Sequence, residues 1–313
     1  MKFKDAVGCF GAACVFLFGS ALIPFLGPLF GLLTPLPFLF YASKLGTHEG
    51  LKVSAITLIL LAFLSYLTGY AHLMFLSVEF CFLGVVLAEL FRKRLSVGTT
   101  ILWATSLVLI LGFTTLTLIG WSKAMGPLDM VQGYVRESLD EAARVYRNMG
   151  MEESQVAEFQ RHLKTLTDMI LKVYLGLLVI GTGFIVWFNV MVSRPLFRLT
   201  GLEYPDFGDL GRWRAPEHLV WGVIASGFSL FLVGGVIQFL AVNSLIVLVA
   251  IYVFHGLAIL IFYLNKLRIP VWVRAGIYFL VVFQQLFLLV LALAGLFDQW
   301  VDFRRIHTRK AAQ

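Results

Sequence analysis

The chain of 313 residues is 59% hydrophobic and only 14% charged. Soluble domains are about a quarter charged, so this composition excludes an ordinary water-soluble enzyme. The net charge is +7, from 25 Lys and Arg residues against 18 Asp and Glu residues, and the basic residues stand in short segments between apolar stretches. Loops of this kind set topology and meet anionic headgroups, so the charge indicates a lipid bilayer as partner and no nucleic acid.

Nine apolar stretches are long enough to cross a bilayer, since a transmembrane helix takes about 20 apolar residues. They cover residues 6–23, 25–43, 53–69, 71–91, 99–121, 169–192, 218–240, 244–264 and 274–296. The sequence therefore predicts an all-α integral membrane protein with about nine transmembrane helices, or eight if one segment is re-entrant.

The second apolar stretch contains or adjoins four prolines, Pro24, Pro28, Pro35 and Pro37. Proline removes a backbone donor and clashes with the preceding helical turn, so this stretch is expected to be kinked or broken. Backbone groups that a break frees in lipid need partners, which places the break against protein or against a cavity.

Polar composition divides the chain into three regions. The N-terminal region, 1–121, holds five of the predicted spans, and the C-terminal region, 169–313, holds the other four and a polar tail. Between them, in 122–168, apolar residues recur every three or four positions on both sides of Gly150, which predicts an amphipathic helical hairpin. The hairpin is expected on the outer face, as a lid over a cavity or as an inert surface cap.

The basic loops predict the orientation in the membrane. Counting spans in order places these residues on one side: Lys2, Lys4, Lys44, Lys52, 92–94, Arg194, Arg198, Arg212, Arg214, Lys266 and Arg268. By the positive-inside rule this side is the cytoplasm, and we expect a multi-pass protein of the bacterial cytoplasmic (inner) membrane. A nine-span count puts the basic tail outside, against the rule. Either the tail is an exception, or one stretch is re-entrant or interfacial.

Sequence motifs for catalysis are missing from the chain. There is no GxxxxGK[ST] phosphate loop, and His48-Glu49 lacks the second histidine that a zinc-protease helix needs. Cys9, Cys14 and Cys81 lie in apolar stretches without metal-ligand spacing. The chain is therefore expected not to be an enzyme and to hold neither a metal nor a cofactor.

Four polar residues fall inside the predicted spans at similar depth: Glu79, His255, Gln284 and Gln285. A charged group at a helix centre costs about 2.5–3.5 kcal/mol on insertion scales, so such residues need a reason to be there. They are candidates for one convergent site that binds a proton, a cation or a ligand amine. The competing interpretation is that they only satisfy one another as interhelical hydrogen bonds.

The polar tail carries a second candidate set, Asp298, Asp302, Arg304 and Arg305. Asp298 and Asp302 are four residues apart and so share a helix face. These charges either form a solvated ion-pair network that fixes the helix end, or dock onto another loop or a partner subunit through Arg–carboxylate pairing.

Several landmarks carry a family resemblance. They are 212–216 (RWRAP), Asn243, Tyr252, 255–258 (HGLA) and the closing run 295–305 (GLFDQWVDFRR). With the proline-rich second stretch and the helical insertion, the chain resembles the YybS-like bacterial membrane proteins over nearly its whole length. The C-terminal cluster is the most specific part, namely Gly295, Asp298, Trp300, Asp302, Phe303 and Arg304.

That family is distantly similar to the substrate-binding S components of energy-coupling-factor vitamin transporters. The resemblance implies a solute-binding subunit that relies on a coupling membrane subunit and on separate ATPases. The chain departs from the S-component pattern in having more than six predicted spans and no AxxxA coupling pattern in its first span.

Two functions remain open at this point. The first is a binding or permease subunit for a small solute, with its pocket between the second stretch and the set of Glu79, His255 and Gln284. The second is a non-transporting membrane scaffold or assembly protein whose basic loops recruit partners. Transport needs a ligand-sized pocket that contains the polar groups, whereas a scaffold needs a packed interior.

Overall fold

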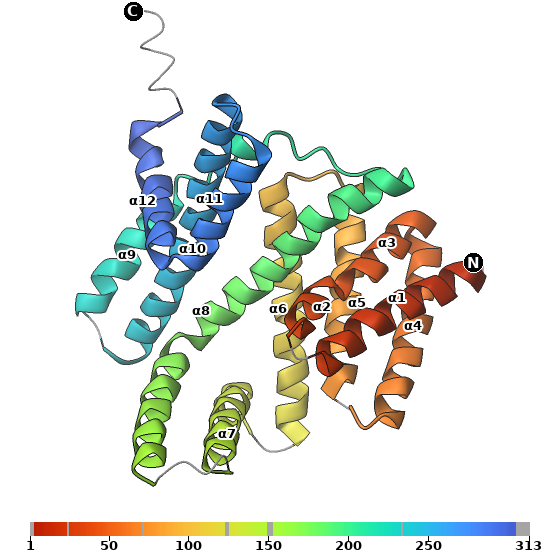
Figure 1. Cartoon of the computed structure of the whole chain (residues 1–313), viewed down its shortest axis with the longest axis horizontal. Helices are drawn as coiled ribbons and strands as arrows, with labels where there is room; N and C mark the ends of the chain where they lie inside the picture. The colour runs from red at the N-terminus through yellow and green to blue at the C-terminus, as the bar shows by residue number, and fades with distance from the viewer. Residues whose placement is uncertain are drawn as a thin grey trace, which may run out of the picture. The chain divides into compact units, whose positions relative to one another are not determined.

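The computed structural model describes residues 3–23, 25–70, 72–122, 125–148, 153–232 and 234–304. Over these ranges every regular element is helical, and no strand occurs among them (Figure 1). The helices are α1 (Phe3–Leu22), α2 (Gly27–Leu33), α3 (Pro35–Leu45), α4 (Thr47–Leu67), α5 (His72–Arg92), α6 (Val97–Ser122), α7 (Pro127–Asn148), α8 (Glu153–Thr200), the 3-10 helix η1 (Leu210–Arg212), α9 (Leu219–Leu232), α10 (Gly235–Lys266), α11 (Val271–Phe283) and α12 (Gln285–Val301). The predicted all-α class is confirmed.

Six of the described helices are long and apolar enough to cross a membrane: α1, α4, α5, α6, the Arg161–Thr200 part of α8, and α10. The pair α11 and α12 adds a seventh if it counts as one span, although it is bent by 99°. The predicted count of nine is therefore not confirmed. The difference arises where an apolar stretch is cut into short helices, as 25–43 is at Thr34 and 218–240 is between α9 and α10.

The break in the second stretch follows from its prolines. Pro28 and Pro35 lie in the first turns of α2 and α3. The first turn is where a helix tolerates proline, because its N–H would have no intrahelical acceptor there, so the chain starts a new helix at each one. The predicted break is confirmed, at Thr34, while Pro24 lies outside the described residues.

The polar insertion contains α7 and the beginning of α8. The turn that was predicted at Gly150 lies outside the described residues, as do its neighbours 149–152. The hairpin arrangement of these two helices therefore stays a prediction, and so does its place on the outer face.

The chain divides into two compact units, one of residues 1–130 with 181–207 and one of residues 131–180 with 208–313. In the first unit α1, α3, α4 and α5 surround a core of Cys9, Ala13, Leu17, Phe38, Val53, Leu61, Leu73 and Cys81. Gly84 lets α3 approach α5 closely, because a Cβ at that position would lie 2.7 Å from the carbonyl oxygen of Pro35.

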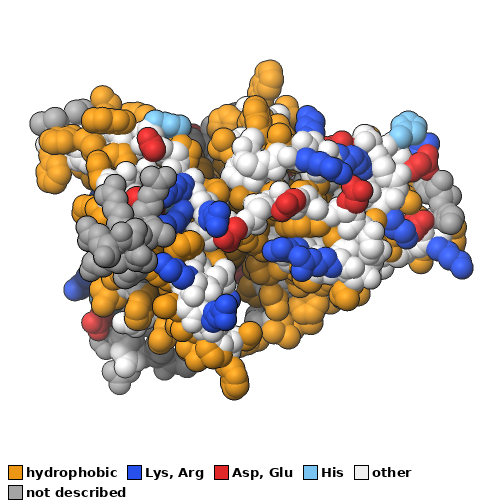
Figure 2. Space-filling model, turned by 90° about the horizontal axis from the view of Figure 1, so that it is seen from above, with side chains coloured by type: hydrophobic (Ala, Val, Ile, Leu, Met, Phe, Trp, Pro, Cys, Tyr) orange, Lys and Arg blue, Asp and Glu red, His pale blue; other side chains and the backbone are white. Residues whose placement is uncertain are grey.

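One end of the first unit gathers basic residues from distant parts of the sequence. Lys44 Nζ at the end of α3 lies 2.6 Å from Asp5 Oδ1 at the start of α1. The helices α2 and α3 together therefore return the chain to the end where α1 begins. Arg92 at the end of α5 donates to Thr47 Oγ1 there (2.6 Å). In the space-filling view of Figure 2, Lys and Arg side chains lie among hydrophobic side chains.

The segment after α8 is held at the same end by aromatic rings. Phe91, Phe197, Tyr204 and Phe207 form an edge-to-face cluster, with the Phe91 and Tyr204 centroids 5.5 Å apart. The Tyr204 hydroxyl donates to the Val190 carbonyl (2.6 Å), and burial raises the pKa of Tyr204 to about 12. The phenol therefore stays a neutral donor at physiological pH, and the loop keeps its anchor.

In the second unit α10 packs against α8, α9 and α12. The Asn243 side chain joins α10 to α8, since its Nδ2 donates to the Lys172 carbonyl (2.9 Å) and its Oδ1 accepts from Gly176 N (2.6 Å). Two glycines let α10 and α12 touch at their backbones. A Cβ on Gly256 would lie 2.0 Å from the Leu291 carbonyl oxygen, and one on Gly295 would lie 2.3 Å from that of Tyr252.

The start of α11 and the end of α12 both lie beside the C-terminal end of α10. At the start of α11, Arg274 contacts the end of α10 twice. Its Nε donates to the carbonyl of Ile269, just past α10 (2.7 Å), and its Nη1 donates to Asn265 Oδ1 in the last turn of α10 (2.7 Å). Beyond the end of α12, the Phe303 carbonyl accepts from the hydroxyl of Tyr263, one turn before the end of α10 (2.6 Å). The chain therefore enters α11 and leaves α12 at the same end of α10. From this geometry we expect α11 and α12 to form a re-entrant pair and not a single bent span.

We expect the tail to lie on the same side of the membrane as the loop between α10 and α11. An impermeant thiol reagent should label cysteines placed at Leu267 and at Ala311 from one side, and a cysteine at Glu158 from the other. The cysteines are placed in a Cys14→Ser background, because Cys14 is partly buried whereas Cys9 and Cys81 are buried and should not react. This background without an added cysteine is the control. Labelling of Leu267 and Ala311 from opposite sides would contradict the re-entrant pair.

Candidate functional site

A buried histidine–carboxylate pair joins α10 to α12. His255 Nε2 lies 3.1 Å from Asp298 Oδ2, and the two side chains are 1% and 0% exposed. Gly256 and Gly295 lie next to this pair, so the close approach of the two backbones is what brings the side chains within hydrogen-bond distance. With an ionised Asp298, Nε2 carries the proton and donates it to the carboxylate.

The second oxygen of Asp298 closes the end of α12. Oδ1 accepts from the backbone N–H of Phe303 (2.8 Å). Asp302 makes this turn possible by adopting a left-handed conformation with φ of 46°, which aspartate tolerates better than most residues. One carboxylate thus holds both the imidazole of His255 and the chain as it leaves the helix.

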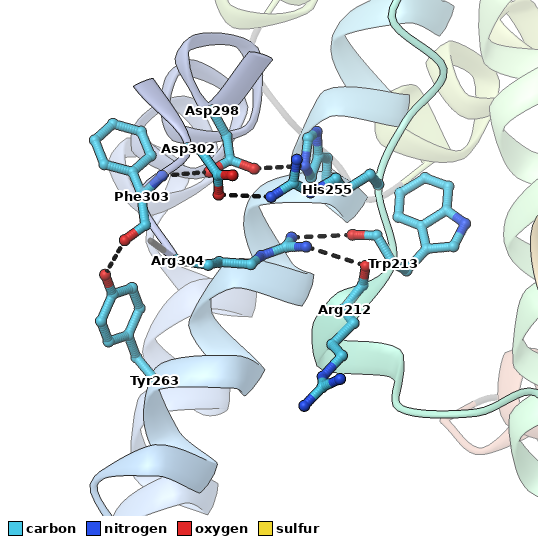
Figure 3. A network of polar contacts seen from close by, with 9 residues as sticks. Arg212, Trp213, His255, Tyr263, Asp298, Asp302, Phe303 and Arg304 are labelled. Carbon is cyan, nitrogen blue, oxygen red and sulfur yellow. Dashed lines mark hydrogen bonds and ion pairs between the residues drawn. The ribbon is translucent and has the colours of Figure 1, made fainter. Parts of the chain in front are cut away.

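Two arginines tie this helix end to the segment 209–216 (Figure 3). Arg304 is 8% exposed and donates to the carbonyls of Arg212 (3.1 Å) and Trp213 (3.0 Å). A second contact has its arginine in the segment 209–216 and its acceptor at the helix end, because Arg214 Nη2 lies 2.6 Å from Asp302 Oδ1. Burial lowers the pKa of the Arg304 guanidinium below its usual value. The carbonyl oxygens and Asp298 compensate the buried charge.

Aromatic rings surround the imidazole. Trp213 meets it edge to face at 6.2 Å between centroids, and Tyr252 lies roughly parallel to it at 6.4 Å. Within the described residues, His255 Nδ1 is buried and makes no hydrogen bond. The pair therefore has one imidazole nitrogen engaged with a carboxylate and the other free to take up a proton.

The four residues of the predicted intramembrane site are divided between the two units. Glu79 belongs to the first unit, where it is half-buried and faces α6, with Oε1 3.4 Å from the position of a Cβ on Gly112. Gln284 and Gln285 are exposed at the break between α11 and α12. His255 alone of the four lies in the network around Asp298. Whether Glu79 contributes to a site stays a prediction.

The structure joins His255 to the predicted tail set instead. Asp298 and Arg304 are buried and, with Asp302, contact α10 or the segment 209–216, while Arg305 lies outside the described residues. Sequence reasoning assigned His255 and Asp298 to two separate hypotheses. The signal that could have linked them is a glycine near each, Gly256 next to His255 and Gly295 one turn before Asp298, since small residues mark close helix approach.

The family of the chain follows from a match to a family model. The model, described as "Predicted membrane protein (DUF2232)", matches residues 11–299. The chain belongs to the DUF2232 family of predicted membrane proteins. The match and the apolar helices together support a multi-pass helical membrane protein in contact with the lipid bilayer. The matched range of this DUF2232 chain includes His255 and Asp298 and ends before Asp302.

Other comparisons leave the function of this DUF2232 chain open. A search among curated proteins and a search among solved structures each found no match. These comparisons do not show a resemblance to YybS-like proteins or to S components.

Proposed function

We propose that this DUF2232 chain is a binding or permease subunit for a small solute in the bacterial cytoplasmic membrane, with His255 and Asp298 as its proton-binding pair. The observation that carries the proposal is the burial of these two ionisable side chains between two apolar helices. His255 lies eleven positions before the end of α10 at Lys266, about 16 Å along the helix at 1.5 Å per residue, and Asp298 lies three positions before the end of α12.

Ionisable side chains buried between apolar membrane helices are rare and are associated with ion pathways and proton relays. His255 is suited to this role because a proton taken up at Nδ1 converts the imidazole to imidazolium beside the Asp298 carboxylate, and its release restores the neutral ring. Asp298 also accepts a hydrogen bond from the N–H of Phe303, so a change in the protonation of the pair also alters the contact that closes the end of α12.

The resemblance to S components supplies the proposed partners. On that basis the chain has no ATPase of its own and works with a coupling membrane subunit and separate ATPases. The missing phosphate loop is compatible with this arrangement.

The alternative function is a non-transporting scaffold or assembly protein. The contacts of Arg304 and Arg214 favour it, because they brace the segment 209–216 and the tail into one rigid surface. In that case the His255–Asp298 pair serves the geometry of this surface and no proton moves.

The experiment that separates the two functions starts with mass spectrometry of small molecules that co-purify with the protein. The solute that is found is then followed into liposomes containing the protein, at external pH values from 5.5 to 8. We expect uptake to depend on pH in the unaltered chain and to lose that dependence in His255→Gln, which keeps a polar side chain but cannot be protonated. His218→Gln, at an exposed position just before α9, is the matched control and should behave like the unaltered chain. A folded protein that carries no solute and moves none would support the scaffold.

A further inference from the structure

The bend between α11 and α12 exposes a polar break among apolar side chains. Residues 282–290, which we call the hairpin tip, are all exposed. Val282 and Leu286 are 71% and 63% exposed, and Gln284 and Gln285 lie between them. Two backbone hydrogen bonds cross the break, from Gln284 N to Leu280 O and from Phe287 N to Gln284 O. The last carbonyls of α11 and the first N–H groups of α12 are the groups that helix ends leave without an intrahelical partner.

This tip belongs inside the hydrocarbon region. The α11 helix has 13 residues and so extends for about 20 Å from its start beside the end of α10, against a hydrocarbon core of about 30 Å. Between Arg274 and Asp298 the sequence has no charged residue, as expected for a segment surrounded by lipid or protein. Lipid offers no hydrogen-bond partners to the backbone groups that a helix break frees. Non-helical backbone at membrane depth is therefore tolerated only where protein or a water-filled cavity covers it.

A second copy of the same chain is the occupant that fits this surface. Each glutamine carboxamide offers two N–H donors and one carbonyl acceptor, so it is complementary to its own copy. A two-fold axis through the tip would set Gln284 and Gln285 of one copy against those of the other, which is the geometry of an isologous dimer. The uncharged surroundings add no repulsion between like surfaces, and glutamine side chains are among those that join helices within membranes.

We propose that this protein forms a homodimer in the membrane through the hairpin tip, with Gln284 and Gln285 hydrogen-bonded across the two-fold axis. The apolar side chains that flank the glutamines, Phe283 and Leu286, pack around this polar centre and exclude lipid from it. The interface does not depend on the proposed transport, because it uses neither His255 nor Asp298.

The test measures association of the full chain in liposomes by energy transfer between two differently labelled populations, over a range of protein-to-lipid ratios. The unaltered chain should associate, and the double variant Gln284→Leu with Gln285→Leu, of similar side-chain volume, should associate at least tenfold more weakly. Helix content and elution in detergent should match the unaltered chain, which shows that the variant folds. A chain that stays monomeric at every ratio, or a dimer unaffected by the double variant, would overturn the proposal.

Oxidative cross-linking locates the interface. A cysteine at Gln284 should give a covalent dimer, whereas a cysteine at Phe228, which is 64% exposed on α9, should give none and serves as the control. Covalent dimers from Phe228 but not from Gln284 would assign the interface to another surface and sink the hairpin-tip dimer.

Discussion

Replacing Gly256 with alanine is expected to destabilise the protein by about 3 kcal/mol or more, at the upper end of what overpacking costs. The added Cβ would lie 2.0 Å from the Leu291 carbonyl oxygen, a distance that no real contact shows. The obstacle is backbone and not the end of a flexible side chain, so α10 and α12 must move apart. That movement also lengthens the His255–Asp298 contact.

Thermal unfolding in detergent, followed by the fraction of protein that remains monodisperse, measures this effect. Gly276→Ala on α11 is the matched control, because a Cβ at that position has nothing within 4 Å. It makes the same chemical change on a neighbouring apolar helix and should leave the unfolding temperature almost unchanged. Equal stability of the two variants would show that α10 and α12 do not touch at Gly256.

Asp298→Ala is expected to be the most damaging change to the polar network. It leaves the buried His255 Nε2 and the partly buried N–H of Phe303 without their shared acceptor. Removing one partner of a buried ionic pair costs about 3–5 kcal/mol, because the remaining polar group stays desolvated and uncompensated. Asp298→Asn keeps an acceptor oxygen and should lose less.

The comparison for this variant is an exposed pair in the same chain. Arg94 and Glu203 lie 3.0 Å apart with side chains 76% and 89% exposed, so Glu203→Ala should cost under about 1 kcal/mol. Free energies of unfolding in mixed detergent micelles give both values on one scale. Equal losses for Asp298→Ala and Glu203→Ala would mean that the Asp298 pair is hydrated and not buried.

The network also gives the two proposed functions a common structural basis. Arg304 and Asp302 hold the segment 209–216 in place, and the same segment presents Trp213 to the His255 ring. A structural role of these contacts and a proton-binding role of the pair therefore coexist. Uptake measured against pH distinguishes them, because a merely structural pair changes stability without changing the dependence of uptake on pH.

The sequence by itself determined the class of the protein and one of its breaks. Long apolar runs predict membrane helices because burial in lipid depends on composition and length, which are local properties. The break in the second stretch was predictable for the same reason. Proline acts on its own turn of helix, so Pro35 starts a new helix whatever it packs against.

Tertiary structure alone decided that α11 and α12 begin and end at the same end of α10, and which residue is the partner of His255. No proline or glycine marks Gln284, so the run 274–296 is indistinguishable from a span by composition. Its return to one end of α10 follows from the contact between Tyr263 and Phe303, which are 40 residues apart, and from the contact of Arg274 with Asn265. His255 and Asp298 are 43 residues apart, and their meeting depends on the depth and rotation of two helices packed at Gly256 and Gly295. Helix periodicity determines on which face of its own helix a residue lies, but only packing determines which residues of another helix lie against that face.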